Sequence, residues 1–84
     1  MTEERIYELA DELHELSKTN TPILLYFDKQ TSVKVLPNGI TCSEDYELIC
    51  DVLEDTPNPY GDDFIKGEEM FVAIEDIDHY EVLG

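Results

Sequence analysis

The N-terminal segment of the chain shows apolar residues at helical spacing. They recur at intervals of three and four positions, at Ile6, Leu9, Leu13 and Leu16. This spacing lays one apolar stripe along a helix. Thr2 stands where an N-cap is expected, Lys18 suits the negative end of the helix dipole, and Pro22 cannot continue the helix. The pattern therefore predicts an amphipathic helix from Thr2 to Lys18.

The next segments change to patterns that are typical of β-strands. Residues 22–27 form a compact apolar and aromatic run, and residues 32–36 alternate two valines with the polar Lys34. Residues 28–31 lie between these runs as a turn, so the two runs predict a hairpin. The Pro-Asn-Gly sequence at positions 37–39 predicts a further turn.

The segment from Glu47 to Glu54 fits two structures. Its apolar residues match a helix at 44–54, and they also match a strand, since Leu48, Cys50 and Val52 alternate with other residues. The β-branched residues and the neighbouring strand signals favour the strand.

The remaining segments complete a mixed pattern. Residues 56–63 are rich in Pro, Asn and Gly and predict a loop, whereas residues 69–74 and 79–83 predict strands separated by a turn at 75–78. We expect one domain, residues 1–84, of the α+β class, with an N-terminal helix and a small bent antiparallel sheet of four or five strands. This order of elements resembles that of the small Sm and SH3 barrels.

Length and composition fit a folded domain without a membrane span. A chain of 84 residues with 42% hydrophobic residues can bury a modest core. No apolar run approaches the ~20 residues of a membrane helix, and the N-terminus is acidic where a targeting peptide would be basic. The two cysteines, Cys42 and Cys50, are expected to be reduced and to be buried or half-buried as small hydrophobic side chains. We therefore expect a cytoplasmic protein.

Negative charge is the extreme feature of the composition. The chain has 21 acidic and five basic residues and a formal net charge of −16, whereas a net charge of roughly 2–8 in magnitude keeps a small domain soluble. Residues 44–84 contain fourteen of the acids and one base, Lys66. Like charges also stand four positions apart on the predicted helix, as at Glu4 and Glu8, which costs roughly 0.2–0.5 kcal/mol per pair. This field disfavours nucleic acid as a direct partner and favours a basic protein.

The most densely acidic segment, residues 75–81, also contains His79. Three of its carboxylates, Asp76, Asp78 and Glu81, are close to this imidazole in sequence, as in some general-base sites. The chain has no nucleophile elbow, phosphate loop or other catalytic motif, and its acidic loops lack the glycine and glutamate positions of an EF-hand. We expect a protein that is not an enzyme and that has no metal site and no cofactor.

The acidic residues indicate an imitation of DNA. B-DNA carries about one negative charge per ~1.7 Å of axis, and carboxylates four positions apart on a helix lie ~6 Å apart, so a folded protein can approximate that field. The expected partner is a basic DNA-binding protein, held by acidic clusters in the second half of the chain and by aromatic anchors. The residues expected to contact this partner are Glu44, Asp45, Glu47, Asp51, Asp62, Asp63, Glu68, Glu69, Glu75, Asp76, Asp78, Glu81, Tyr60 and Tyr80.

In size, net charge and order of elements, the chain resembles phage-encoded acidic DNA mimics. This group includes inhibitors of uracil-DNA glycosylase, of restriction enzymes and Cas effectors, and of the bacterial nucleoid protein HU. These proteins share no sequence motif, so the resemblance assigns no individual residue. It implies a bacteriophage inhibitor that acts in the host cytoplasm during host takeover, and similarity in size and acidity favours HU as the target.

The apolar run Met70–Ile74 indicates other modes of association. It favours a strand near the C-terminal end of the sequence, where little chain remains to cover it. We expect this strand to pair with a second copy and give a homodimer, against the repulsion between two chains of −16. The alternative to DNA mimicry is a non-enzymatic small-barrel adaptor or assembly module that binds through this edge strand.

Overall fold

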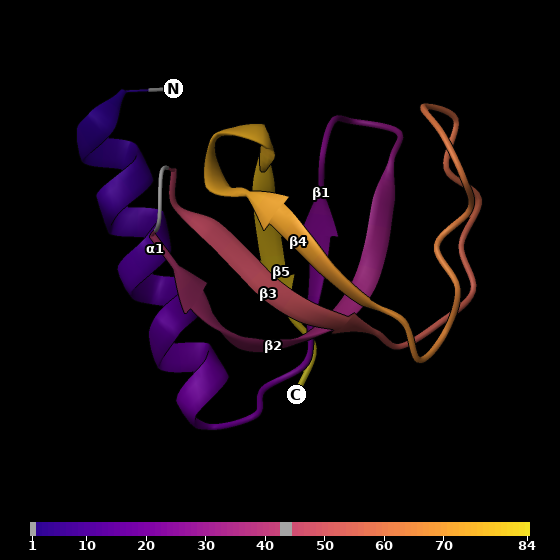
Figure 1. The fold of residues 1–84 in the computed structure, drawn as a ribbon, viewed down its shortest axis with the longest axis horizontal. Coiled ribbons are helices and arrows are strands. Elements are labelled where there is room, and N and C mark those ends of the chain that lie inside the picture. The colour runs from indigo at the N-terminus through magenta and orange to yellow at the C-terminus, as the bar shows by residue number, and fades with distance from the viewer. Residues whose placement is uncertain (1, 43–44) are drawn as a thin grey trace.

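The computed structural model describes residues 2–42 and 45–84 and has the expected α+β architecture (Figure 1). In chain order its elements are α1 (Glu3–Lys18), β1 (Ile23–Tyr26), β2 (Ser32–Thr41), β3 (Glu47–Val52), β4 (Glu69–Ala73), the 3-10 helix η1 (Ile74–Asp76) and β5 (His79–Val82). The strands form one antiparallel sheet with the order β4-β3-β2-β1-β5. The fold class predicted from the sequence, one helix and a small antiparallel sheet, is thus confirmed.

Helix α1 begins and ends where the sequence predicts. The Thr2 hydroxyl accepts a hydrogen bond of 3.2 Å from the backbone N–H of Arg5, as expected of an N-cap. After Lys18 the chain leaves the helix, and Asn20 adopts a left-handed backbone with φ of 51°, a conformation that asparagine tolerates. Among the described residues, no helix is long and apolar enough to cross a membrane.

The structure decides one open alternative and corrects one prediction from local patterns. The alternative helix at 44–54 is wrong, because residues 47–52 form β3. Every second residue of this strand, namely Leu48, Cys50 and Val52, is buried in the core. The turn predicted at 37–39 is also wrong, because β2 runs through these residues. The register of β2 against β3 shifts between Pro37 and Gly39, so the turn-forming residues produce a bulge within a long strand.

The sheet curls because its two edge strands are neighbours in sequence. Strands lie about 4.8 Å apart, so the edges of a flat five-stranded sheet would be roughly 19 Å apart. Residues 74–78 connect β4 to β5 and include η1, in which the chain rises only about 2 Å per residue. This connection falls short of the flat distance, and the sheet therefore curls without closing into a barrel (Figure 1).

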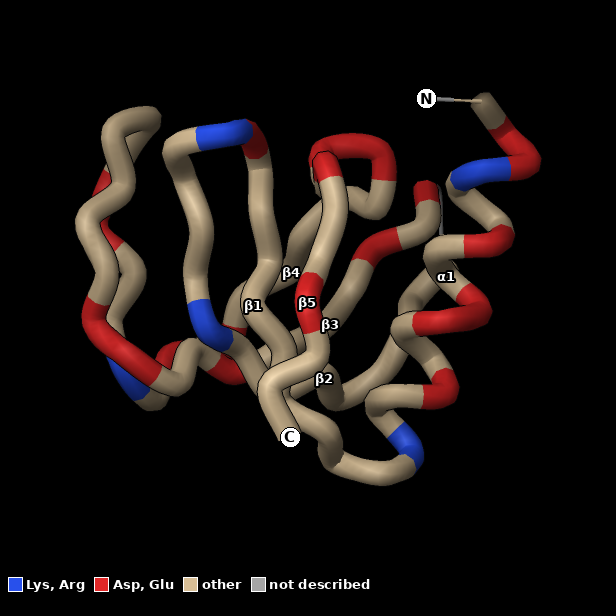
Figure 2. The backbone as a smooth tube through the Cα atoms, turned by 180° about the vertical axis from the view of Figure 1, so that it is seen from behind, with Lys and Arg blue, Asp and Glu red and all other residues tan. Residues whose placement is uncertain are grey.

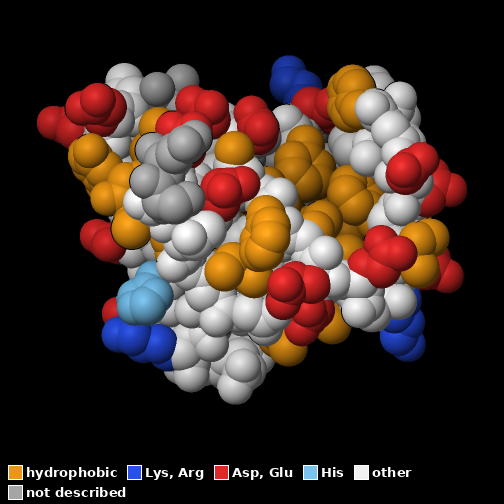
Figure 3. All heavy atoms as spheres, viewed as in Figure 1, with side chains coloured by type: hydrophobic (Ala, Val, Ile, Leu, Met, Phe, Trp, Pro, Cys, Tyr) orange, Lys and Arg blue, Asp and Glu red, His pale blue; other side chains and the backbone are white. Residues whose placement is uncertain are grey.

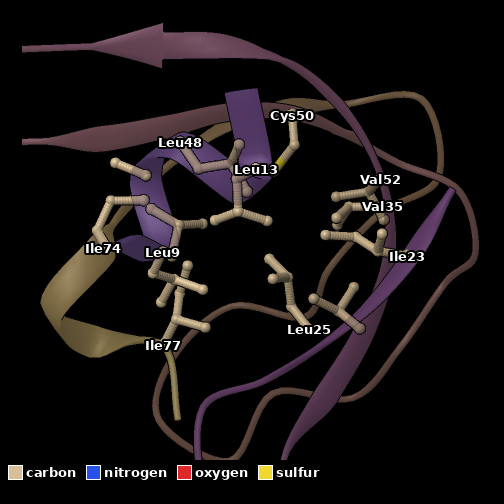
Figure 4. Close-up of a cluster of buried hydrophobic side chains, with 13 residues drawn as sticks. Leu9, Leu13, Ile23, Leu25, Val35, Leu48, Cys50, Val52, Ile74 and Ile77 are labelled. Carbon is tan, nitrogen blue, oxygen red and sulfur yellow. The ribbon is translucent and has the colours of Figure 1, made fainter. Parts of the chain in front are cut away.

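The concave side of the curled sheet contains the core, and α1 packs against it, mainly on β2 (Figure 4). The buried apolar side chains are Leu9, Ala10, Leu13, Ile23, Leu25, Val33, Val35, Leu48, Cys50, Val52, Val72, Ile74 and Ile77. Leu9 and Leu13 come from the middle of the predicted helical stripe, and Ile6 and Leu16 are partly buried at its ends. Burying a leucine contributes roughly 1.5–3 kcal/mol, which explains why this stripe docks the helix.

The two cysteines are free thiols in different surroundings. Cys50 is buried as expected, and burial, together with the nearby charges of Asp51 and Glu69, raises the pKa of its thiol to about 12. Cys42 is exposed, so the expectation that it would be buried or half-buried was wrong. Its position follows the end of β2, where the chain leaves the sheet and no longer faces the core.

Candidate functional site

Acidic residues recur along the whole length of α1 (Figure 2). The few basic residues of this helix are placed among them: Arg5 Nη1 lies 3.7 Å from a carboxylate oxygen of Glu8 and 3.6 Å from one of Glu12. Lys18 Nζ lies 3.2 Å from Glu15 Oε1. Exposed ion pairs of this kind contribute about 0–1 kcal/mol each. They partly offset the repulsion expected between like charges four positions apart.

Tyr80, predicted as a contact residue for the partner, connects β5 to α1. Its hydroxyl donates a hydrogen bond of 2.8 Å to Glu12 Oε1. Partial burial and then this hydrogen bond raise the pKa of Tyr80 to about 12. The phenol of Tyr80 therefore has a structural contact within the fold, and its role as a partner contact stays a prediction.

A cleft of about 230 Å³ lies between the start of α1, the turn before β3 and the helix η1. Its lining residues are Glu3, Ile6, Tyr7, Asp45, Tyr46 and Glu75, and we refer to it as the acidic cleft. The rings of Tyr7 and Tyr46 meet edge to face, with their centroids 5.4 Å apart. Three carboxylates and two aromatic rings around one cleft suit an ammonium or guanidinium group, which binds both carboxylates and ring faces.

Only some of the residues that line the acidic cleft were predicted from the sequence to contact a partner. Asp45 and Glu75 belong to the set expected from the sequence, whereas Glu3 and Tyr7 do not. These residues come from three segments that are far apart in the chain. Local patterns show that each residue is polar or amphipathic, but they do not show that the start of α1 lies beside η1. That proximity follows from the curl of the sheet.

A second hollow, which we call the aromatic groove, lies along the open side of β4. It has a volume of about 450 Å³ and is lined by Phe27, Asn58, Tyr60, Phe64, Met70, Phe71, Val72, Ala73 and Asp76. The rings of Phe27 and Phe64 are stacked with their centroids 5.8 Å apart. Figure 3 shows hydrophobic side chains gathered in a hollow on this face, with acidic side chains around it. The predicted contact residues Tyr60 and Asp76 are thus brought to one groove.

The loop between β3 and β4 forms one wall of the aromatic groove and is held by hydrogen bonds. Thr56 and Phe64 exchange two backbone hydrogen bonds of 2.9 Å. The Tyr60 hydroxyl donates a hydrogen bond to Asp28, in the turn between β1 and β2. This hydrogen bond lowers the pKa of Asp28 and raises the pKa of Tyr60. The Thr56–Phe64 pair therefore closes the loop on itself, and the Tyr60–Asp28 hydrogen bond ties the wall to the turn between β1 and β2.

The other predicted contact residues are distributed over several elements. Asp51 lies directly opposite Glu69 across β3 and β4, an arrangement that destabilises a sheet. Glu47 begins β3 and pairs with Ala73. The remaining described members are Asp62, Asp63 and Glu68, in the loop before β4, and Asp78 and Glu81, before and within β5. Glu44 lies outside the described residues.

The acids are therefore not gathered on one surface. Asp45 and Glu75 meet at the acidic cleft, beside α1, whereas Asp62 and Asp63 belong to the loop at the opposite end of the molecule (Figures 1 and 2). Asp63 has a local role as well, because its carboxylate accepts a 3.2 Å hydrogen bond from the backbone N–H of Asn58. The predicted acidic clusters thus lie at two ends of the fold, and which of them contacts a partner stays a prediction.

His79 makes a local pair with Asp78. Its Nδ1 atom lies 2.6 Å from an Asp78 carboxylate oxygen, and its ring stacks on Tyr26 with the centroids 4.2 Å apart. These contacts orient the imidazole on β5. Among residues 2–42 and 45–84, no three His, Cys, Asp or Glu side chains are grouped so that they could hold a metal ion.

Comparison of the chain with known proteins found no matching family model, no matching curated protein and no matching solved structure.

Proposed function

We propose that this protein binds a basic DNA-binding protein and occupies the surface that the partner uses for DNA. The observation that carries the proposal is the acidic cleft, where Glu3, Asp45 and Glu75 surround the Tyr7–Tyr46 pair. A lysine or arginine side chain that normally contacts a phosphate would find charge partners and aromatic rings there. The cleft thus provides a specific contact within a strongly negative molecule.

Charge arrangements that weaken the fold support the same proposal. The like-charged pair Asp51 and Glu69 lies directly opposite across two strands, and the acids of α1 outnumber its bases. Each such arrangement has a folding cost that a neutral or oppositely charged residue would avoid. A basic partner would relieve this repulsion on binding, and the opposed fields would accelerate the encounter.

The test begins with affinity capture from bacterial lysate, followed by identification of the retained proteins. Purified HU is the first partner to examine, and DNA should compete with this protein for it. Affinity should fall steeply as salt rises, because the interaction is mainly between opposed charges. A retained protein that binds DNA and this chain at the same time would contradict mimicry.

Paired charge variants separate the acidic cleft from the general field. Asp45→Asn with Glu75→Gln should weaken binding by at least about tenfold, whereas Asp62→Asn with Glu68→Gln should weaken it by only about twofold. Both double variants change the net charge equally, and circular dichroism should show both to be folded. Equal losses would show that net charge alone acts and that the cleft is not the contact.

A further inference from the structure

The edge of β4 presents unpaired backbone groups. Val52 N–H donates to Glu68 C=O, and Ile74 N–H donates to Tyr46 C=O, so the even-numbered residues of this segment bond to β3. Because these groups alternate along an antiparallel strand, Phe71 and Ala73 direct their N–H and C=O groups away from β3. Among the described residues, no strand pairs with β4 on that side. The edge can therefore accept a further strand.

The aromatic groove lies beside this open edge. Phe27, Phe64, Met70 and Val72 contribute apolar surface to it, and the exposed rings of Phe71 and Tyr60, at 61% and 74% exposure, border it. Exposed aromatic residues around a hollow are typical of protein-binding surfaces. A strand added to β4 would thus gain backbone hydrogen bonds and bury apolar side chains together.

The charges around the groove determine which occupant fits. Asp76 lines the groove, Asp28 is bonded to Tyr60, and Glu69 is exposed on β4. No basic residue is among the described residues that line it. A second copy of the chain would bring its own β4 acids to the same edge. A segment with lysine or arginine on each side of its apolar residues would instead complement these carboxylates.

We propose that β4 and the aromatic groove bind an extended segment of a partner protein, apolar at alternate positions and flanked by Lys or Arg, which adds to the sheet beside β4. This inference does not rest on DNA mimicry, because its surface is distinct from the acidic cleft. The two proposals can fail separately. The Asp45→Asn, Glu75→Gln variant should have a lower affinity for the DNA-binding partner and an unchanged affinity for a peptide that adds to β4.

The probe is a fluorescein-labelled peptide, Lys-Lys-Val-Thr-Phe-Thr-Val-Arg-Lys, whose binding to the full chain is followed by fluorescence anisotropy. Two N-methylated forms keep its charge and residue sequence and have two methyl groups each: one is methylated at the first Val and at Phe, the other at both Thr. Only one set of N–H groups can face β4. One form should therefore lose at least about tenfold in affinity and the other should lose much less. Equal effects of the two forms would overturn strand addition.

Matched variants of the chain locate the binding edge. Phe71→Ser on β4 should weaken peptide binding by at least about tenfold, whereas Val82→Ser on β5 should change it by less than about twofold. Both side chains are more than half exposed, at 61% and 52%, so neither substitution removes a core contact. Equal losses would overturn the assignment to β4.

A peptide with Glu in place of Lys and Arg should not bind, and its binding would overturn the charge argument.

Ala73→Pro removes a donor from the open edge without removing a β3 hydrogen bond. The φ angle of Ala73 is −60°, which proline adopts readily. This variant should keep its circular dichroism spectrum and lose peptide affinity; full retention of affinity would count against the proposal.

Light scattering at low and high salt, without peptide, tests whether a second copy of the chain occupies the β4 edge instead. A dimer that Ala73→Pro abolishes would assign the edge to a second copy and overturn the proposal.

Discussion

The two edges of the sheet differ in how they are protected. On β5, Tyr80 is hydrogen-bonded to Glu12 of α1, His79 is paired with Asp78, and Glu81 adds a charge. On β4, Phe71 is exposed and lies beside the aromatic groove. Charged residues and side-chain contacts are common means of preventing a strand edge from pairing with another chain.

This difference indicates a division of roles between two strands that only five residues connect. The β5 edge contributes to the closed part of the fold through its contact with α1. The β4 edge keeps backbone donors and acceptors available and has apolar surface next to them. In the proposal above, repulsion from the surrounding carboxylates would restrict pairing of β4 with identical chains and would leave the edge open to basic segments.

A substitution in the core that supports both edge strands should have the largest effect on stability. Leu13→Asp would place a carboxylate among the fully buried side chains that support the whole sheet. We expect a loss of about 4 kcal/mol or more, which approaches the total stability of a small domain. Far-UV circular dichroism should show the loss of both helix and strand. His14→Ala, at an exposed position of the same helix, is the control and should change stability by less than about 0.5 kcal/mol. An unchanged melting curve for Leu13→Asp would contradict the packing of α1.

Proline substitutions at adjacent positions should distinguish the two sides of β4. Val72→Pro removes a donor that faces β3 and should destabilise the protein by about 2–3 kcal/mol, since a buried acceptor is left unpaired. Ala73→Pro removes a donor that faces outward and should cost less than about 1 kcal/mol. Urea unfolding of both variants measures the difference. Equal destabilisation would mean that the outward side of β4 is already engaged.

Removing the contact between β5 and α1 should have a smaller effect. Tyr80→Phe deletes the hydroxyl that donates to Glu12 and should cost about 0.5–1 kcal/mol at neutral pH. The pKa of Tyr80 is raised to about 12 from its ordinary 10.0. Its stabilising contribution is therefore fully present below pH 10 and is lost as the pH rises through about 12. Alkaline titration of tyrosine absorbance should lose a late component in Tyr80→Phe, and an unchanged titration would contradict this assignment.

The smallest effect is expected at the tip of the groove wall. Hydrogen bonds from Tyr60 and from the backbone lower the pKa of Asp28 below its usual 3.8. The stabilisation is thus present above that value and is lost as the pH falls through the lowered pKa. Asp28→Asn should melt slightly below the wild type at neutral pH, and the difference should disappear in strong acid. A difference that persisted in acid would mean that the charge of Asp28 is not its cause.

The sequence predicted the parts of the fold that depend on local periodicity. The stripe that includes Leu9 and Leu13 predicted α1, and the alternation of Leu48, Cys50 and Val52 favoured β3 over a helix. The bulge at 37–39 could not be distinguished from a turn, because the same residues suit both and the pairing of β2 with β3 decides between them.

The candidate sites were only partly predictable, because distant segments form them. Phe27, Phe64 and Phe71 lie in three different parts of the chain and meet at the groove through the curl of the sheet. Glu3 and Tyr7 reach Glu75 for the same reason. The composition indicated acidic surfaces, but only the tertiary structure separates a charge-binding cleft from an apolar groove.

The pairing of β1 with β5 also affects the order in which the fold assembles. Strands β1 to β4 pair with their neighbours in sequence. By contrast, β1 pairs with β5 across a long separation in sequence, as between Ile23 and Val82. Closing so long a loop is entropically costly, so β5 should dock late, and the amide hydrogens of β5 that are bonded to β1 should exchange before those within the β2–β3 pair. Until β5 docks, β1 is a second open edge. The many acidic residues in the second half of the sequence would then keep nascent copies apart by charge repulsion, as charged gatekeepers do beside aggregation-prone strands.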